Sequence, residues 1–215
     1  MKAEDVVQYL RDNPGFFEDY AELLSQIYIP HPHGGRAIPI AERQILTLRD
    51  KSKALEAKLV ELINFGEEND AIGEKMHRLC IALFPAGDMQ SMLRGIYYNL
   101  REDFAVPHAA VRIWRGGGDG PEFSPVSDAM REYAAGLEHP FCGPSGNVEA
   151  ASWFGEGAAH VRSVAHIALR DEANACIGML ALASEEVLRF YPEMGTLYLK
   201  RLGELASASL QRYNI

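Results

Sequence analysis

The organisation of the chain follows from residues 40–62, which read IAERQILTLRDKSKALEAKLVEL. Apolar or small side chains recur there at alternating intervals of four and three residues, at Ala41, Ile45, Leu48, Ser52, Leu55, Leu59 and Leu62. This heptad spacing keeps one seam of a helix against a partner helix. Charged residues fill most of the positions between. The stretch therefore predicts a long helix with a single apolar seam.

We expect this seam to form a parallel homodimer. The expected interface consists of Ile45, Leu48, Ser52, Leu55, Leu59 and Leu62 from each chain. A helix that packs on its own domain is the alternative, and the sequence leaves the two open. Pro39 suits the first turn of the helix, and Gly66 and Gly73 later occupy the seam. The apolar stripe fades there, so we assign residues 39–75 to the helix and residues 76–215 to a separate domain.

Residues 1–38 are expected to form a helical hairpin followed by a loop. One short amphipathic helix ends at Asn13-Pro14-Gly15, and an apolar face from Phe16 to Tyr28 predicts a second. The segment Pro30–Gly35 has the composition of a loop. Its two histidines, His31 and His33, lack a third ligand nearby, so we expect no metal site.

Residues 76–215 alternate helical and extended patterns. Helices are expected at 76–83, from Asp88 to Leu100, from Ser127 to Leu137, at 148–154 and at 192–213; strands are expected at 108–114, 163–169 and 175–183. The segment Pro140–Gly146 reads as a break in the chain. Such an order predicts the α+β class, with an antiparallel sheet flanked by helices.

Composition excludes several classes of function. Hydrophobic residues make up 47% of the chain and charged residues 24%, with no apolar run of membrane-spanning length. The acidic start resembles no signal peptide, and Cys80, Cys142 and Cys176 are too scattered for a disulfide framework, so we expect a cytoplasmic protein. The net charge of −9 argues against direct nucleic-acid binding and against anionic membrane surfaces.

Two sets of residues carry a family resemblance. Gly178–Ser184, followed by Phe190, resembles the last strand and turn of a GAF domain. Tyr9–Phe17, Ile29–His31, Glu42–Arg49 and Phe190–Thr196 with Leu199 are similar to an uncharacterised proteobacterial family, domain of unknown function 484. The resemblance spans nearly the whole chain and implies a GAF-like domain behind helices, without a known activity. Genes of that family often lie beside a tyrosine recombinase gene, which hints at an unidentified protein partner.

GAF-like domains generally bind a small molecule on one face of the sheet. The resemblance implies a cavity lined by Arg112, Trp114, Phe141, Cys142, Ser145, Ser163 and His166. Three of them have a structural alternative: Trp114 as a core residue, Arg112 as a surface strand residue, and His166 as a hydrogen-bonded sheet histidine. The residues used by cyclic-nucleotide-binding GAF domains cannot be traced, and His139 with Cys142 does not match the bilin pattern. Some GAF proteins reduce free methionine sulfoxide with clustered cysteines, which this chain lacks.

We therefore expect a non-enzymatic regulatory protein that senses an unidentified small molecule and signals through a dimeric helix; no cofactor is known for it. A protein-binding adaptor with a vestigial cavity is the alternative. It would dock a partner through the Phe16–Tyr28 face or the seam, and the expected lack of an output domain after Ile215 favours it. An enzyme that uses Cys142 is the third possibility.

Overall fold

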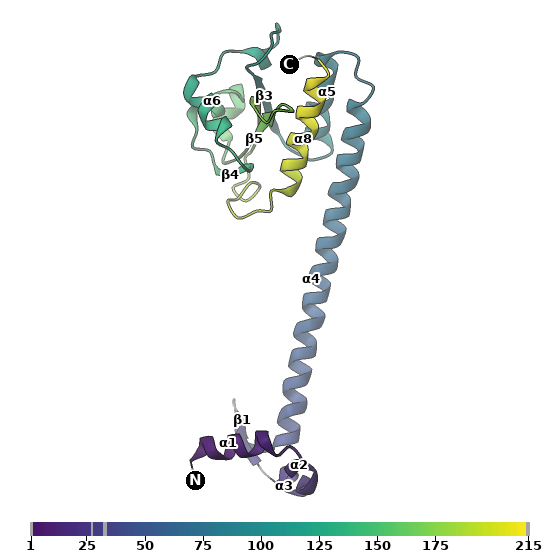
Figure 1. The fold of residues 1–215 in the computed structure, drawn as a ribbon, viewed down its shortest axis with the longest axis vertical. Coiled ribbons are helices and arrows are strands. Elements are labelled where there is room, and N and C mark those ends of the chain that lie inside the picture. Colours follow the sequence, from purple (N-terminus) through teal and green to yellow (C-terminus); the bar gives the residue numbers. More distant parts are fainter. Residues whose placement is uncertain (1, 27, 32–33, 214–215) are drawn as a thin grey trace. The chain divides into compact units, whose positions relative to one another are not determined.

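The computed structural model describes residues 2–26, 28–31 and 34–213, and for residues 24–42 it describes the backbone alone (Figure 1). The chain divides into two compact units, residues 1–67 and 68–215. Each unit is described by itself below. No helix among the described residues is both long and apolar enough to cross a membrane.

The first unit begins with three short helices, α1 (Ala3–Asp12), α2 (Phe16–Asp19) and α3 (Ala21–Gln26). The turn at Asn13-Pro14-Gly15 lies where the sequence predicts it. The single second helix predicted from Phe16 to Tyr28 is wrong, because Tyr20 leaves the helical conformation between α2 and α3.

The predicted loop over Pro30–Gly35 is also wrong in part. Strands β1 (Tyr28–His31) and β2 (Gly34–Pro39) pair antiparallel there, with Ile29 opposite Ile38. Proline in an apolar run reads as a loop, yet proline is tolerated where a strand edge is free, as both edges of a two-stranded ribbon are. His33 lies outside the described residues.

Helix α4 (Ile40–Leu83) runs without interruption for 44 residues. It confirms the long helix predicted from the heptad, and it continues through both Gly66 and Gly73 (Figure 1). Its last turns belong to the second unit, where Leu79 and Leu83 are buried.

The second unit is built on a four-stranded antiparallel sheet of order β3-β6-β5-β4. The strands are β3 (His108–Ile113), β4 (Phe141–Pro144), β5 (Ser163–Arg170) and β6 (Cys176–Ser184). Around it lie α5 (Met89–Glu102), α6 (Asp128–Ala135), α7 (Val148–Ser152), α8 (Leu197–Gln211) and the short 3-10 helices Pro121–Phe123 and Gly155–His160. The predicted α+β class with an antiparallel sheet is confirmed.

Each face of the sheet has its own apolar cluster. One face packs on the end of α4, on α5 and on α8, with Leu79, Ile96, Leu180 and Leu202 in the cluster. We call this the α8 face. The other face packs on α6 and α7 around Met130, Ala134, Ala150 and Met179, and we call it the α6 face (Figure 1). Strand side chains alternate between the two faces because the side-chain period of a strand is two residues.

Polar caps begin the helices as their sequences predict. Asp88 accepts a hydrogen bond from the backbone N–H of Ser91 at 2.7 Å, and Ser127 accepts one from Met130 at 3.1 Å. These bonds satisfy amide groups that the first helical turn leaves free. Two predictions differ from the structure: α8 starts at Leu197 rather than at 192, and β4 lies in the predicted break. Pro144 is tolerated in β4 because that strand is the edge of the sheet.

Candidate functional site

The seam of α4 is exposed from Ile45 to Leu62. The exposed fractions of Leu48, Leu55 and Leu62 are 65%, 71% and 60%, and Ile45 and Leu59 are at least half exposed. Ser52 is exposed as well. Leucines are common in protein interiors, and a continuous row of exposed ones marks a surface for another apolar surface.

The same helix ends inside the core of the second unit. Leu79 and Leu83 are almost fully buried in the cluster on the α8 face. Helix α8 is also tied to α4 by polar bonds: the Tyr198 hydroxyl donates to the carbonyl of Asn69 at 3.0 Å, and Arg212 Nη1 donates to the carbonyl of Leu83 at 3.2 Å. The end of α4 and α8 therefore form one packed element.

The sheet separates the seven residues predicted to line a ligand cavity. Arg112, Phe141 and His166 lie on the α6 face, and Trp114 packs against the cluster there. Cys142 belongs to the cluster on the α8 face, where it lies opposite Ala165 in the strand register. The Ser163 hydroxyl donates a hydrogen bond to the carbonyl of Glu186 and accepts one from the N–H of Phe190, both in the chain after β6. Ser145 follows β4 and is half-buried.

His166 is the most enclosed titratable side chain of this set, with 2% of its surface exposed. Its Nδ1 lies 2.9 Å from the Tyr133 hydroxyl, and the rings of Tyr133 and Phe141 each lie 5.7 Å from its own ring. Its Nε2 is buried and has no hydrogen-bond partner among the described residues. Burial lowers the pKa of His166 to about 4, because the charged imidazolium loses its hydration there. The histidine is therefore neutral at pH 7.

Arg112 and Trp114 are held by packing contacts on the α6 face. The Arg112 guanidinium lies 5.0 Å from the centre of the Trp153 ring, and burial lowers its pKa. The Trp114 indole N–H donates to the carbonyl of Cys176 at 2.9 Å. Both side chains are thus engaged with the protein itself.

The cysteines lie in surroundings that disfavour thiolate chemistry. Burial raises the pKa of Cys142 to about 11 and also raises the pKa of Cys176. A reactive cysteine requires the opposite shift, because the thiolate is the nucleophile. Among the described residues, no three His, Cys, Asp or Glu side chains gather as a metal site would require.

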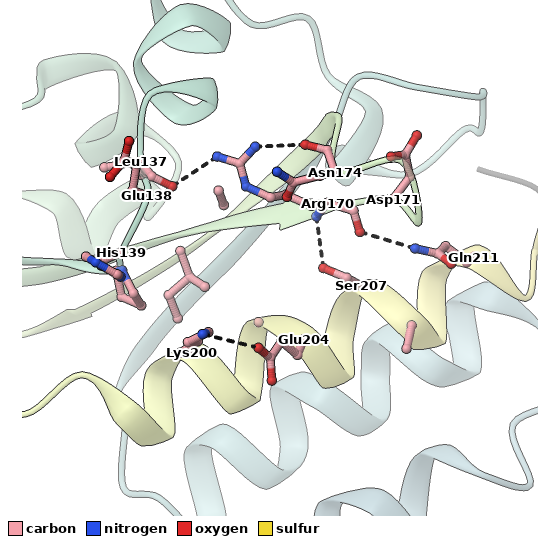
Figure 2. A pocket seen from close by; sticks show the side chains of 15 residues that line it. Leu137, Glu138, His139, Arg170, Asp171, Asn174, Lys200, Glu204, Ser207 and Gln211 are labelled. Atoms are coloured by element: carbon pink, nitrogen blue, oxygen red, sulfur yellow. Dashed lines mark hydrogen bonds and ion pairs between the residues drawn. The ribbon is translucent and has the colours of Figure 1, made fainter.

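A polar hollow of about 480 Å³ lies at the edge of the sheet (Figure 2). We call it the edge hollow. It lies between residues 137–140, the end of β5 and one face of α8, and its lining is Leu137, Glu138, His139, Pro140, Ile167, Ala168, Arg170, Asp171, Asn174, Lys200, Gly203, Glu204, Ser207, Ala208 and Gln211. A second hollow lies around Pro107, Glu185 and Arg189. None of the seven predicted residues lines either hollow.

Arg170 closes one end of the edge hollow. Its guanidinium donates to the carbonyls of Asn174 at 3.0 Å, Ala135 at 2.8 Å and Leu137 at 3.0 Å. Its backbone N–H donates to Ser207 Oγ at 3.0 Å, and its carbonyl accepts from Gln211 Nε2 at 3.2 Å (Figure 2). Arg170, Ser207 and Gln211 thus form the frame of the hollow.

Two oppositely charged side chains of the edge hollow pair only loosely with each other. Lys200 and Glu204 form a loose, exposed ion pair at 3.9 Å on α8, and His139 lies on the opposite wall (Figure 2). The volume matches that of small-molecule sites, which are typically a few hundred Å³. Sequence reasoning missed these residues because they come from three separate segments; the one local signal is Gly203 inside a helix, where glycine is unfavourable.

The chain is similar to known proteins in sequence and in structure. The chain is 25% identical to the uncharacterized protein YigA of Shigella flexneri over 221 residues, which cover 97% of this chain and 90% of YigA. A free methionine-R-sulfoxide reductase from Neisseria meningitidis, solved in complex with its substrate, is similar in structure with a TM-score of 0.51 at 16% identity, over 67% of this chain and 92% of the reductase. The nlh2 GAF domain of A. aeolicus is also similar, with a TM-score of 0.49 at 10% identity, over 67% of this chain and 98% of that domain.

At these identities the solved structures show the fold alone, and the reductase fold confirms the expected GAF-like architecture. The family match is wider than the structural one, because it takes in the N-terminal helices as well as the sheet. The family described as "Protein of unknown function, DUF484" matches residues 1–215, and the chain therefore belongs to it.

Proposed function

We propose that this protein is a dimeric, non-enzymatic regulator whose GAF-like unit binds a small molecule and whose helix α4 pairs with that of a second copy. One observation carries the proposal. The row of apolar side chains that is exposed from Ile45 to Leu62 belongs to the same helix whose end, at Leu79 and Leu83, is buried in the ligand-binding unit. In this proposal, pairing and ligand binding act on the same helix.

The charges beside the seam favour a parallel pair of identical chains. In the heptad register, Lys51 and Glu56 occupy the flanking positions that face each other between parallel helices. An antiparallel pair would instead bring Lys51 and Lys58 of one chain towards the same lysines of the other. Leucine at 48, 55 and 62, with Ile45 at the alternate position, also suits two-stranded pairing.

Regulation then requires that the ligand bind two poses of α4 with different affinity, since a ligand shifts an equilibrium only by its differential affinity. The bonds from Tyr198 and Arg212 to α4 offer a route, because α8 contacts α4 and also lines the edge hollow. The raised pKa of the Cys142 and Cys176 thiols supports a non-enzymatic role over thiol chemistry.

Native mass spectrometry of freshly purified protein tests this function. We expect a species of twice the 23.8 kDa mass of one chain, carrying a small-molecule adduct that dissociates at higher collision energy. An adaptor that merely docks a protein partner would also be dimeric, but without the adduct. A monomer, or a dimer that stays empty and shows no thermal shift with metabolite libraries, would contradict the sensor.

A further inference from the structure

We infer that the edge hollow binds a short zwitterionic peptide, two or three residues long, by pairing it with the free edge of β5. This inference rests on the proposed small-molecule function and names the site and the class of ligand. It follows from the geometry of one strand edge, from the helix beside it, and from the charges around both.

Strand β5 is longer than the strand that covers its outer edge. β4 begins at Phe141, opposite His166, so it does not reach Ala168 or Arg170. The backbone N–H and C=O of Arg170 point away from β6, because they bond to Ser207 and Gln211 of α8. Backbone groups alternate in direction along an antiparallel strand, so those of Ala168 point the same way, towards the hollow.

Helix α8 bonds to the strand edge at Arg170, and near Ala168, which lines the hollow, it has a residue without a side chain. One turn before Ser207 the helix has Gly203, which has no side chain to reach the strand. A Cβ at residue 203 would lie 3.7 Å from the carbonyl oxygen of Ala168 and 2.5 Å from Cγ2 of Ile167. The glycine thus lets α8 approach β5 closely, while Ala168 lines the hollow.

This edge has room for one residue pair. An antiparallel residue opposite Ala168 would donate its N–H and accept at its C=O, which is how peptides add to sheet edges. The pairing cannot extend, because Phe141 covers His166 on one side and α8 caps Arg170 on the other. A long partner strand therefore does not fit, whereas a dipeptide or tripeptide does.

The charges in the hollow suit a ligand with one positive and one negative end. Lys200 and His139 can receive a carboxylate, and Glu204 can receive an ammonium group. The ion pair between Lys200 and Glu204 is exposed, and such pairs are weak enough to exchange for a ligand's charges. Acidic and basic side chains occur together here, so phosphate-rich ligands are disfavoured.

Calorimetric titration of the full chain with trialanine tests the inference. We expect a Kd below about 1 mM for trialanine. We expect Lys200→Gln to weaken binding about tenfold, because it removes a charge-assisted hydrogen bond to the carboxylate. Lys75→Gln, on α4 and outside the hollow, serves as the matched control and should bind as the parent does. Acetylating the peptide's amino group should also weaken binding about tenfold in the parent, and much less in Glu204→Gln.

Three results would overturn the inference. The first is that neither trialanine nor a mixed tripeptide pool binds, and the second is that Lys200→Gln and Glu204→Gln leave binding unchanged. The third is that a decapeptide with both ends capped binds equally well or more tightly, which would indicate that the edge pairs with a partner's strand. None of these results contradicts the proposed function. That function fails separately if native mass spectrometry finds monomers or a protein without a bound small molecule.

Discussion

Replacing Leu55 and Leu59 together by lysine should convert the protein from a dimer into a monomer. Both side chains are more than half exposed in one chain, so their burial must come from a partner. Burying a leucine stabilises by about 1.5–3 kcal/mol, and the double variant removes four such side chains per dimer and adds four like charges. The dimer should therefore weaken by at least roughly 10⁴-fold. Sedimentation equilibrium across a concentration series measures this directly.

The matched control for the seam is Ala54→Lys with Ala57→Lys. It adds the same charges to the same two turns of α4, at heptad positions that face away from the seam. We expect this variant to remain dimeric and equally helical by circular dichroism. If the seam variant stays dimeric, the chains pair through another surface; if both variants dissociate, general repulsion rather than the seam is responsible.

Lowering the pH from 8 to 5 should cost about 2 kcal/mol of unfolding free energy through His166 alone. Burial lowers its pKa from 6.5 to about 4, so the unfolded chain binds a proton at a higher pH than the folded chain does. The contribution is therefore fully present above pH 6.5 and is lost as the pH falls towards 4. Urea unfolding of the parent and of His166→Gln at both pH values isolates the effect.

Glutamine at position 166 does not titrate and can still accept the hydrogen bond of the Tyr133 hydroxyl. We expect the loss between pH 8 and pH 5 to be about 2 kcal/mol smaller in His166→Gln than in the parent. All other histidines and carboxylates contribute equally to both proteins. An identical loss in the two would mean that the imidazole is hydrated in solution, and that the α6 face is open there.

The sequence predicted best where one periodicity acts over many residues. The heptad from Ala41 to Leu62 predicted a helix, and α4 spans Ile40–Leu83. The alternation in β5 and the caps at Asp88 and Ser127 are equally local signals, and the structure has them. β1, β2 and β4 were missed because proline and glycine lie in them, and edge strands tolerate those residues.

The candidate site was harder to predict because its parts are joined by the fold alone. The residues of the predicted cavity come from β3, β4, β5 and the loops beside them, and the pleat sends Phe141 and Cys142 to opposite faces. The edge hollow exists because β5 continues past His166, whereas β4 begins only opposite it, at Phe141. No local sequence pattern encodes this difference in strand length. Gly203, a glycine inside a helix, was the one local signal of the hollow in the sequence.

Pulsed electron paramagnetic resonance between identical spin labels tests the central claim, a parallel pair of α4 helices, most directly. Labels at position 43 and, separately, at position 64 lie on the face of α4 away from the seam, in a chain whose native cysteines are replaced. A parallel, in-register pair predicts short and equal distances for both labels, on the order of 20–30 Å. An antiparallel pair centred on the seam would give more than roughly 35 Å at both positions. Long or unequal distances, or no dipolar signal at all, would contradict the account.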